Sequence, residues 1–279
     1  MKKLSIITIN LNNSDGLQKT IESVVIQTFQ NFEYIVIDGA STDNSVNVIN
    51  EYAERITYWL SESDSGIYNA MNKGIRVAKG EYLLFLNSGD VLCSQYVLDQ
   101  MLNNHYTEDM LIGNKYCVIS NRKVPWHITI HHGNKKDNSV YGIDLIFDSL
   151  PHQASFIKKE LFIKYGLYDE TLQLVSDWKF TLDVIINHNI TTRLFRDVYV
   201  CDFNVEGRSM NSSGLMSKEI NSVLKSYFPA KVLDDYNRYV YPEYIMRKYW
   251  LSRVLRLIIF KITIFFDMIL SKKTEFKSS

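Results

Sequence analysis

Residues 61–90, SESDSGIYNAMNKGIRVAKGEYLLFLNSGD, are the most informative stretch of the chain. In its first part, apolar residues recur at helical spacing, and Gly80 ends the predicted helix. These residues are Ile67, Ala70, Met71, Gly74, Ile75 and Ala78. Tyr82 to Leu86 then reads as a buried strand, and Asp90 closes the polar run behind it. The stretch therefore predicts a turn, a helix and a strand that lead to one acidic side chain.

The same alternation precedes this stretch. Three apolar runs predict further strands, over residues 4–9, 32–37 and 56–60. Helical stripes lie between them, formed by Leu17, Ile21, Val24 and Val25 and then by Val46, Ile49 and Ala53. Because strands buried on both faces alternate with helices, we expect an α/β fold with a doubly wound, mainly parallel central sheet and flanking helices.

The second half of the chain is less regular. We expect a strand over residues 111–119 and helices over residues 158–165 and 175–186. Residues 121–150 predict a long loop, and loops of that length often carry function.

The composition bounds the class of protein. A chain of 279 residues with 46% hydrophobic and 22% charged residues is typical of a folded soluble protein. Lys+Arg and Asp+Glu each number 31, so the chain has no general attraction for nucleic acid, and we expect no nucleic-acid partner. Cys93, Cys117 and Cys201 fit neither a disulfide framework nor a zinc site with paired ligands, which favours a cytoplasmic protein. The apolar run after Met1 is too short for a secretory signal peptide.

Polar side chains gather where the predicted strands end. They are Thr8, Asn10, Asp38, Asp64, Asn87, Ser88 and Asp90. In doubly wound sheets, ligands bind beyond the carboxyl ends of the strands, so these residues together predict one shared pocket. Each of them taken alone is also a common turn former or helix cap.

Five segments carry a more specific pattern. They are SIITIN at 5–10, SVVIQTF at 23–29, YIVIDGASTD at 34–43, DSGIYNAMNKG at 64–74 and GEYLLFLNSGD at 80–90. Together they resemble the family 2 glycosyltransferases, inverting enzymes of the GT-A type that use a nucleoside-diphosphate sugar. The resemblance implies a glycosyltransferase of bacterial surface-glycan synthesis, transferring a hexosyl or N-acetylhexosaminyl group.

The resemblance also assigns the nucleotide-sugar site. It implies nucleoside binding by four residues, Thr8, Asn10, Asp38 and Asp64. A base and a ribose need a few fixed donors and acceptors in a cleft, which these side chains supply. Asn87 and Ser88 are expected to complete nucleotide-sugar binding. Lys73 is expected to offset phosphate charge, with a solvated helix face as the alternative.

The run after the last strand departs from the family pattern. Many relatives carry two or three aspartates there, whereas Asn87, Ser88 and Gly89 precede Asp90 in this chain. A leaving diphosphate calls for Mg²⁺ or Mn²⁺, and one carboxylate can hold such an ion together with substrate phosphates and waters. Asp90 is therefore the expected metal ligand, and the sequence leaves open whether the missing acids lower metal dependence.

Inverting transfer requires a base that takes the proton of the acceptor hydroxyl. The family places an Asp for this purpose at the start of a helix in the second half, often after a His-Gln segment. Here LPHQA at 150–154 precedes LVSDW at 174–178, and the resemblance assigns the base to Asp177. His152, Trp178 and Arg208 are the expected contacts to acceptor or diphosphate. A structural role for His152 and a core position for Trp178 are the alternatives.

We divide the chain into three parts by function. Residues 1–105 form the nucleotide-sugar-binding half of a GT-A domain, residues 106–230 its acceptor-binding and catalytic-base half, and residues 231–279 a C-terminal helical extension. The apolar stretch 257–270 is shorter than the roughly 20 residues that span a bilayer. Its basic flanks favour a helix lying on the inner face of the plasma membrane. Packing on the catalytic domain or on a second subunit of a homo-oligomer is the alternative.

The sequence thus predicts transfer of a sugar from a nucleoside-diphosphate donor, with a UDP-sugar favoured, to a hydroxyl of a saccharide or lipid-linked saccharide. A dinucleotide-dependent oxidoreductase is disfavoured, because no Gly-X-Gly-X-X-Gly follows the first strand. A non-catalytic nucleotide-sugar-binding or scaffold protein of the same fold is the alternative, motivated by the missing acids. The sequence does not specify the sugar, the acceptor, the linkage or the oligomeric state.

Overall fold

The structure, a computed structural model, describes residues 2–120, 122–126, 138–140, 142, 145, 149–204 and 213–240. The chain divides into two compact units, Met1–Val223 and Leu224–Ser279. The second unit begins within α8 (Ser213–Tyr227), and the structure describes α9 (Ala230–Asp235) and a π-helical segment over Tyr236–Val240 in it. All that follows concerns the first unit.

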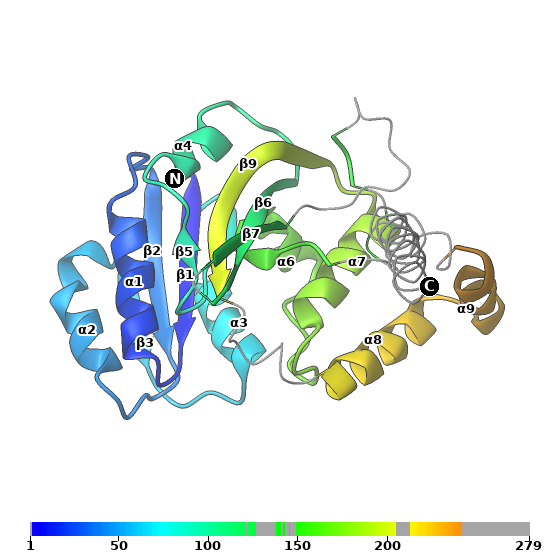
Figure 1. The fold of residues 1–279 in the computed structure, drawn as a ribbon, viewed down its shortest axis with the longest axis horizontal. Helices are drawn as coiled ribbons and strands as arrows, with labels where there is room; N and C mark the ends of the chain where they lie inside the picture. The colour runs from blue at the N-terminus through cyan, green and yellow to red at the C-terminus, as the bar shows by residue number, and fades with distance from the viewer. Residues whose placement is uncertain are drawn as a thin grey trace, which may run out of the picture. The chain divides into compact units, whose positions relative to one another are not determined.

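The first half of the chain forms the parallel part of the sheet (Figure 1). Its strands are β1 (Leu4–Asn10), β2 (Phe32–Asp38), β3 (Tyr58–Ser61) and β4 (Tyr82–Phe85). They lie in the order β3-β2-β1-β4, with every neighbouring pair parallel. The connecting helices are α1 (Ser14–Val25), α2 (Ser45–Glu51) and α3 (Ile67–Val77). The predicted doubly wound α/β arrangement is confirmed here.

Strand β1 is buried on both faces, which explains its nearly continuous apolar sequence. Leu4 and Ile6 share one buried cluster with Leu17 of α1. Ile7 faces α3 on the other side, where a Cβ added to Gly74 would lie only 2.5 Å from the Ile7 side chain. Glycine at position 74 therefore lets α3 approach the sheet closely.

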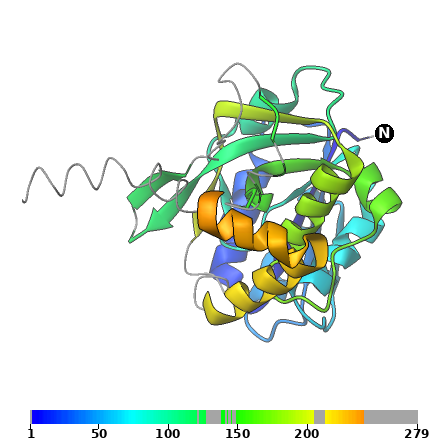
Figure 2. The ribbon, with the colours of Figure 1, turned by 90° about the vertical axis from the view of Figure 1, so that its right-hand side faces the viewer.

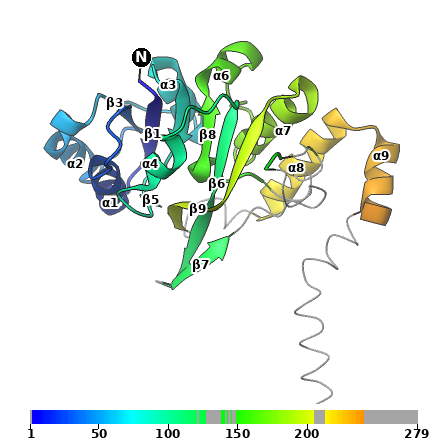
Figure 3. The same cartoon turned by 90° about the horizontal axis from the view of Figure 1, so that it is seen from above.

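Beyond β4 the sheet becomes mixed. The next strands in order are β8 (Ser155–Lys158), β6 (Met110–Ile119), β9 (Thr192–Asn204) and β5 (Val91–Leu92), and β7 (Arg122–Trp126) pairs with β6. Only β6 and β9 are parallel in this half, while the other pairings are antiparallel. Figure 2 and Figure 3 show β6 and β7 as a hairpin that extends beyond the neighbouring strands.

Two local predictions need correction. Strand β7 lies within the range predicted as loop, because an exposed edge strand containing Pro125 carries no burial pattern to read. Helix α2 ends at Glu51, so Ala53 lies exposed in a 3-10 turn (Ala53–Arg55) instead of continuing the buried stripe. Val48 and Ile49 face the core in its place.

The remaining helices are α4 (Val97–Leu102), α6 (Lys159–Tyr165) and α7 (Ser176–His188), and a 3-10 turn, η2, covers His152–Ala154. Aromatic packing fixes the position of α7. The rings of Phe162 on α6 and Phe180 on α7 stack with centroids 4.3 Å apart. Phe162 also meets Phe85 of β4 edge-on at 6.2 Å. This buried contact between strand and helices holds the start of α7, where Asp177 lies.

Candidate active site

The ends of β1, β2 and β3 meet in a buried network centred on Asp38. Its carboxylate accepts hydrogen bonds from Asn10 Nδ2 at 2.8 Å and from Ser61 Oγ at 2.6 Å. The backbone N–H and the hydroxyl of Ser41 donate at 2.9 Å and 2.5 Å. Burial alone would raise the pKa of Asp38, but the hydrogen bonds from Ser41, Ser61 and Asn10 outweigh it and lower the pKa. Asp38, with no exposed surface, is therefore an ionised brace for three strand ends.

Two other residues predicted for the nucleotide sugar are engaged elsewhere. Thr8 is completely buried, and its hydroxyl lies 3.0 Å from the Tyr34 hydroxyl. The Lys73 ammonium pairs with Glu62 at 2.9 Å and donates to the Ser63 carbonyl at 2.9 Å. Thr8 thus packs within the core, while Lys73 fastens the turn that precedes α3.

Asp64 lies beside the end of β2. Its Oδ1 accepts a hydrogen bond from Gly66 N at 3.1 Å, which shapes the turn into α3. Its Oδ2 faces Gly39, where an added Cβ would lie 2.6 Å away. Gly39 N in turn donates to the Asn10 carbonyl at 2.9 Å. The structure therefore brings Asn10, Asp38 and Asp64 together at one end of the parallel strands.

A cavity of about 1000 Å³ opens beyond the end of β4. Six predicted site residues line it, namely Asn87, Ser88, Asp90, His152, Asp177 and Trp178. Five do not, namely Thr8, Asn10, Asp38, Asp64 and Lys73. Arg208 lies outside the described residues. Ser65 and Gly66 connect the cavity wall to the turn that contains Asp64.

Asp177 lies in the first turn of α7, and both of its carboxylate oxygens are hydrogen-bonded. The Tyr68 hydroxyl donates to Oδ1 at 2.8 Å, and His152 Nδ1 lies 2.8 Å from Oδ2. Burial would raise the pKa of Asp177, but the contacts with His152 and Tyr68 and the backbone N–H of Trp178 lower it. Asp177 is therefore an ionised carboxylate, held in place and able to accept a proton.

His152 connects this carboxylate to the loop after β4. Its Nε2 lies 3.3 Å from Asn87 Nδ2. An amide nitrogen only donates, so Nε2 is the acceptor and Nδ1 carries the proton that is shared with Asp177. The two contacts together fix the orientation of the imidazole ring.

Trp178 forms part of the cavity wall. Its Nε1 donates to the Leu145 carbonyl at 2.8 Å, and the residue is 7% exposed. Most of the ring is therefore packed inside the protein, which matches the core alternative for this residue.

Asp90 is the second buried acid of the cavity, with 4% of its surface exposed. The backbone N–H of Asn204 donates to Oδ1 at 3.2 Å. Burial raises the pKa of Asp90 to about 6, because the charges of His152 and Lys115 and the hydrogen bonds from Asn204 and Gln153 offset the burial only in part. The favourable contacts of the Asp90 carboxylate are therefore too few to offset the effect of burial on its pKa.

Three residues of this site were not predicted from the sequence. Tyr68 was hidden within a helix interpreted as packing, and only its distance to Asp177 reveals a role for its hydroxyl. Gln153 follows His152 in the His-Gln segment, so a signal for it was present. Lys115 lies within a predicted strand and belongs to none of the quoted motifs.

Comparisons with known proteins agree with this arrangement. The model of the family Glycosyl transferase family 2 matches residues 5–165. A PGL/p-HBAD biosynthesis glycosyltransferase of Mycobacterium tuberculosis is 28% identical over 216 residues, which cover 75% of this chain and 79% of that protein. The poly(ribitol-phosphate) beta-N-acetylglucosaminyltransferase TarP of Staphylococcus aureus is 29% identical over 252 residues, which cover 83% of this chain and 74% of TarP.

A solved structure shares the fold. Staphylococcus aureus TarS 1-349 in complex with UDP-GlcNAc matches with a TM-score of 0.61 at 21% identity. The match covers 75% of this chain and 61% of that one, so this chain spans less than two thirds of its length.

The fold and the cavity define a protein of the GT-A class. Because the family model matches more than half of the chain, the chain belongs to Glycosyl transferase family 2 and is a glycosyltransferase. As for membranes, the described part of the chain contains no helix of the length and hydropathy that a bilayer span requires.

Replacing Asp38 tests the brace at the strand ends. Asp38→Asn leaves a neutral amide facing four donor groups, so we expect a loss of about 2–3 kcal/mol in the free energy of unfolding at pH 7. Because the folded pKa of Asp38 lies below its unfolded value, its contribution is full at neutral pH and is lost as the pH falls through that lowered pKa. Urea unfolding at pH 7 and at acidic pH measures both effects.

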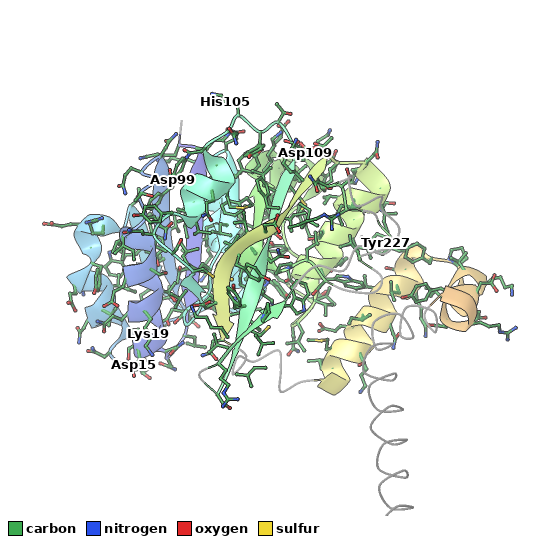
Figure 4. The ribbon with its side chains drawn as sticks, turned by 45° about the horizontal axis from the view of Figure 1, so that its top comes forward. Asp15, Lys19, Asp99, His105, Asp109 and Tyr227 are labelled. Atoms are coloured by element: carbon green, nitrogen blue, oxygen red, sulfur yellow. The ribbon has the colours of Figure 1, made fainter. Side chains whose placement is uncertain are left out.

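A matched control is Asp15→Asn, because Asp15 is exposed at the start of α1 (Figure 4). It should change stability far less. Equal stability losses in the two variants would contradict the role of Asp38 as a brace.

Proposed function

We propose that this glycosyltransferase moves a sugar, with inversion at the anomeric carbon, from a UDP-sugar to a hydroxyl of a saccharide or lipid-linked saccharide. The observation that carries the proposal is one cavity containing both Asp90 and an ionised, doubly hydrogen-bonded Asp177. Its volume of about 1000 Å³ is suited to a ligand of nucleotide-sugar size.

In the proposed reaction, Asp177 is the base. The acceptor oxygen attacks the anomeric carbon and forms the new C–O bond while its proton passes to the Asp177 carboxylate. The bond between the anomeric carbon and the phosphate oxygen breaks, and the nucleoside diphosphate leaves with the bonding electron pair. Tyr68 and His152 keep the carboxylate ionised and oriented throughout.

The oxygen atoms around Asp90 fit a hard cation. Two buried amide oxygens, Asn87 Oδ1 and Gln153 Oε1, have no hydrogen-bond partner within the described residues, and both residues line the cavity with Asp90. Carboxylate and amide oxygens are typical ligands of Mg²⁺ and Mn²⁺. No group of three His, Cys, Asp or Glu side chains suited to a metal occurs in the described part of the chain, so substrate phosphates would complete the site. The cation would neutralise the diphosphate as it leaves.

The nucleoside is proposed to bind at the strand ends beside Asp64. Asn10 Oδ1 is a buried acceptor with no partner in the described residues, which supports a polar contact there. Neither Asp38 nor Thr8 has exposed surface, so neither would contact the nucleoside directly. Each would contribute by holding its hydrogen-bond partners in place. Lys73 would act by fastening the turn that carries Asp64.

Other residues complete the proposal. Asn87 and Ser88 are proposed to contact the donor, and His152, Trp178 and Arg208 the acceptor or the diphosphate.

N-acetylglucosamine is the favoured sugar, because TarP is named for its transfer and TarS was solved with UDP-GlcNAc. A cell-surface polysaccharide is the favoured acceptor. The functional division at residues 1–105, 106–230 and 231–279 is retained as part of the proposal.

The last of these parts, residues 231–279, is proposed to hold the enzyme on the cytoplasmic face of the membrane. Residues 241–279 lie outside the described residues, so the proposal rests on their sequence alone. Basic residues beside an apolar stretch bind anionic lipid surfaces, where a lipid-linked acceptor would be available.

Replacing the base tests the chemistry. Asp177→Asn should lower kcat by about 10²–10⁴, because the amide cannot take up the acceptor proton. UDP affinity should be largely unchanged. UDP release and calorimetry measure the two quantities, with Asp183→Asn as the matched control on the same helix, where Asp183 accepts from Asn187 Nδ2. Near-wild-type transfer by a folded Asp177→Asn variant would contradict the proposal.

Replacing Asp90 tests the cation site. With UDP present, Mn²⁺ should raise the Tm of the wild type but not that of Asp90→Asn. In EDTA the variant should be the more stable protein above about pH 6 and equal to the wild type near pH 3.8 and below, because burial raises the folded pKa of Asp90 from 3.8 to about 6 and ionisation is then unfavourable. Thermal melts across this pH range give both results. The same Mn²⁺ shift in both proteins would speak against Asp90 as a ligand.

Removing the C-terminal extension tests the membrane contact. The full chain should sediment with vesicles that contain anionic lipid, and added salt should weaken the binding. A chain ending at residue 240 should remain in the supernatant. If both proteins sediment alike, residues 241–279 do not provide the contact.

A further inference from the structure

Lys115 is a charged cavity residue to which the reaction above gives no role. It lies on β6 and lines the same cavity as Asp90, together with Phe203 and Asn204 of β9. Within the sheet, Lys115 pairs with Cys201, which precedes Phe203 by two positions on the strand. Because side chains two apart on a strand lie on one face, Lys115 and Phe203 belong to the same side of the sheet.

Two aromatic rings hold the Lys115 ammonium. Its Nζ lies 3.9 Å from the ring centroid of Phe203 and 5.3 Å from that of Trp126, which is its direct neighbour on β7. Contacts of this kind orient a cation but leave its charge in place. None of the ion pairs formed among the described residues includes Lys115. The cavity wall therefore presents a fixed positive charge.

This charge lies close to the acid of the loop after β4. Asn204, the residue after Phe203, donates its backbone N–H to Asp90 Oδ1 at 3.2 Å. Asp90 and Lys115 thus form a pair of opposite charges on one wall.

A positive side chain next to a negative one suits a phosphate group that binds together with a metal cation. A lysine ammonium binds phosphate as a point charge, while a carboxylate binds it through a metal ion. The loop Asn87–Asp90 supplies only one carboxylate, so a metal there would be held with few protein charges. A protein cation next to it would take over part of the phosphate charge.

We propose that Lys115 binds the diphosphate of the nucleotide-sugar donor and shares its neutralisation with the cation at Asp90. This inference rests on the proposed function. Lys115 is a binding residue in it, and transfer of the proton remains with Asp177.

Calorimetry with UDP and with uridine, each in Mn²⁺ and in EDTA, tests the inference. Lys115→Gln should weaken UDP binding about tenfold or more, the size expected for a lost charge-assisted hydrogen bond. Uridine has no phosphate, so its affinity should not change. Lys115→Arg should retain most of the UDP affinity, because the charge is kept. The loss in Lys115→Gln should be larger in EDTA, where the ammonium acts alone.

The matched control is Lys123→Gln on the neighbouring strand β7. Lys123 pairs with Asp202 at 2.6 Å and does not line the cavity, so this variant should bind UDP as the wild type does. Circular dichroism and Tm confirm that each variant is folded. Unchanged UDP affinity in folded Lys115→Gln, or equal weakening of UDP and uridine, overturns the inference and leaves the proposed function standing. A wild type that binds neither UDP nor uridine overturns both.

Discussion

The hydrogen bonds to the Asp177 carboxylate join the two halves of the sheet. Tyr68, on α3 between the parallel strands β3 and β4, donates to one oxygen, and His152, just before the antiparallel strand β8, contacts the other. A largely buried carboxylate without such partners is unfavourable, so the contacts from both halves stabilise the start of α7. The cavity lies between these halves, and its shape depends on this interaction.

Three acids, the buried Asp38 and Asp90 and the partly buried Asp177, differ in their hydrogen-bond partners. Asp38 and Asp177 receive enough hydrogen bonds to lower their pKa, so each is ionised in the folded protein. Asp90 receives too few, and burial raises its pKa to about 6. Asp38 is therefore a structural brace, while the proposed function makes Asp177 the base and Asp90 the ligand of a cation. Asn87, whose neutrality motivated the non-catalytic alternative, lies 3.3 Å from His152 Nε2 through its side-chain nitrogen and helps to orient the ring that contacts Asp177.

The sequence predicted the parallel half closely, because strands buried on both faces and amphipathic helices leave strong periodic patterns. It predicted little of β7, β8 and β9, since β7 is an exposed edge strand, β8 has only 4 residues and β9 has mixed exposure, so none of them shows a clear period. The same contrast holds for the cavity. Asp90, His152 and Asp177 stand in recognisable segments and line the cavity as predicted. Tyr68 also stands in a quoted segment, but its contact with Asp177 depends on long-range packing, and Lys115 belongs to no quoted segment. Thr8 and Asp38 lie near the ends of β1 and β2 as predicted, but their side chains hydrogen-bond to other side chains inside the protein.

In the proposed function, the donor diphosphate lies beside Asp90 in the cavity, the anomeric carbon faces Asp177 and the nucleoside lies at the strand ends beside Asp64. A crystal structure of the Asp177→Asn protein with UDP-GlcNAc and Mn²⁺ tests this placement. We expect diphosphate density beside Asp90 and Lys115, the uracil toward Asp64, and residue 177 on the face of the sugar opposite the leaving phosphate. A donor bound outside this cavity, or with residue 177 on the same side as the phosphate, would contradict it.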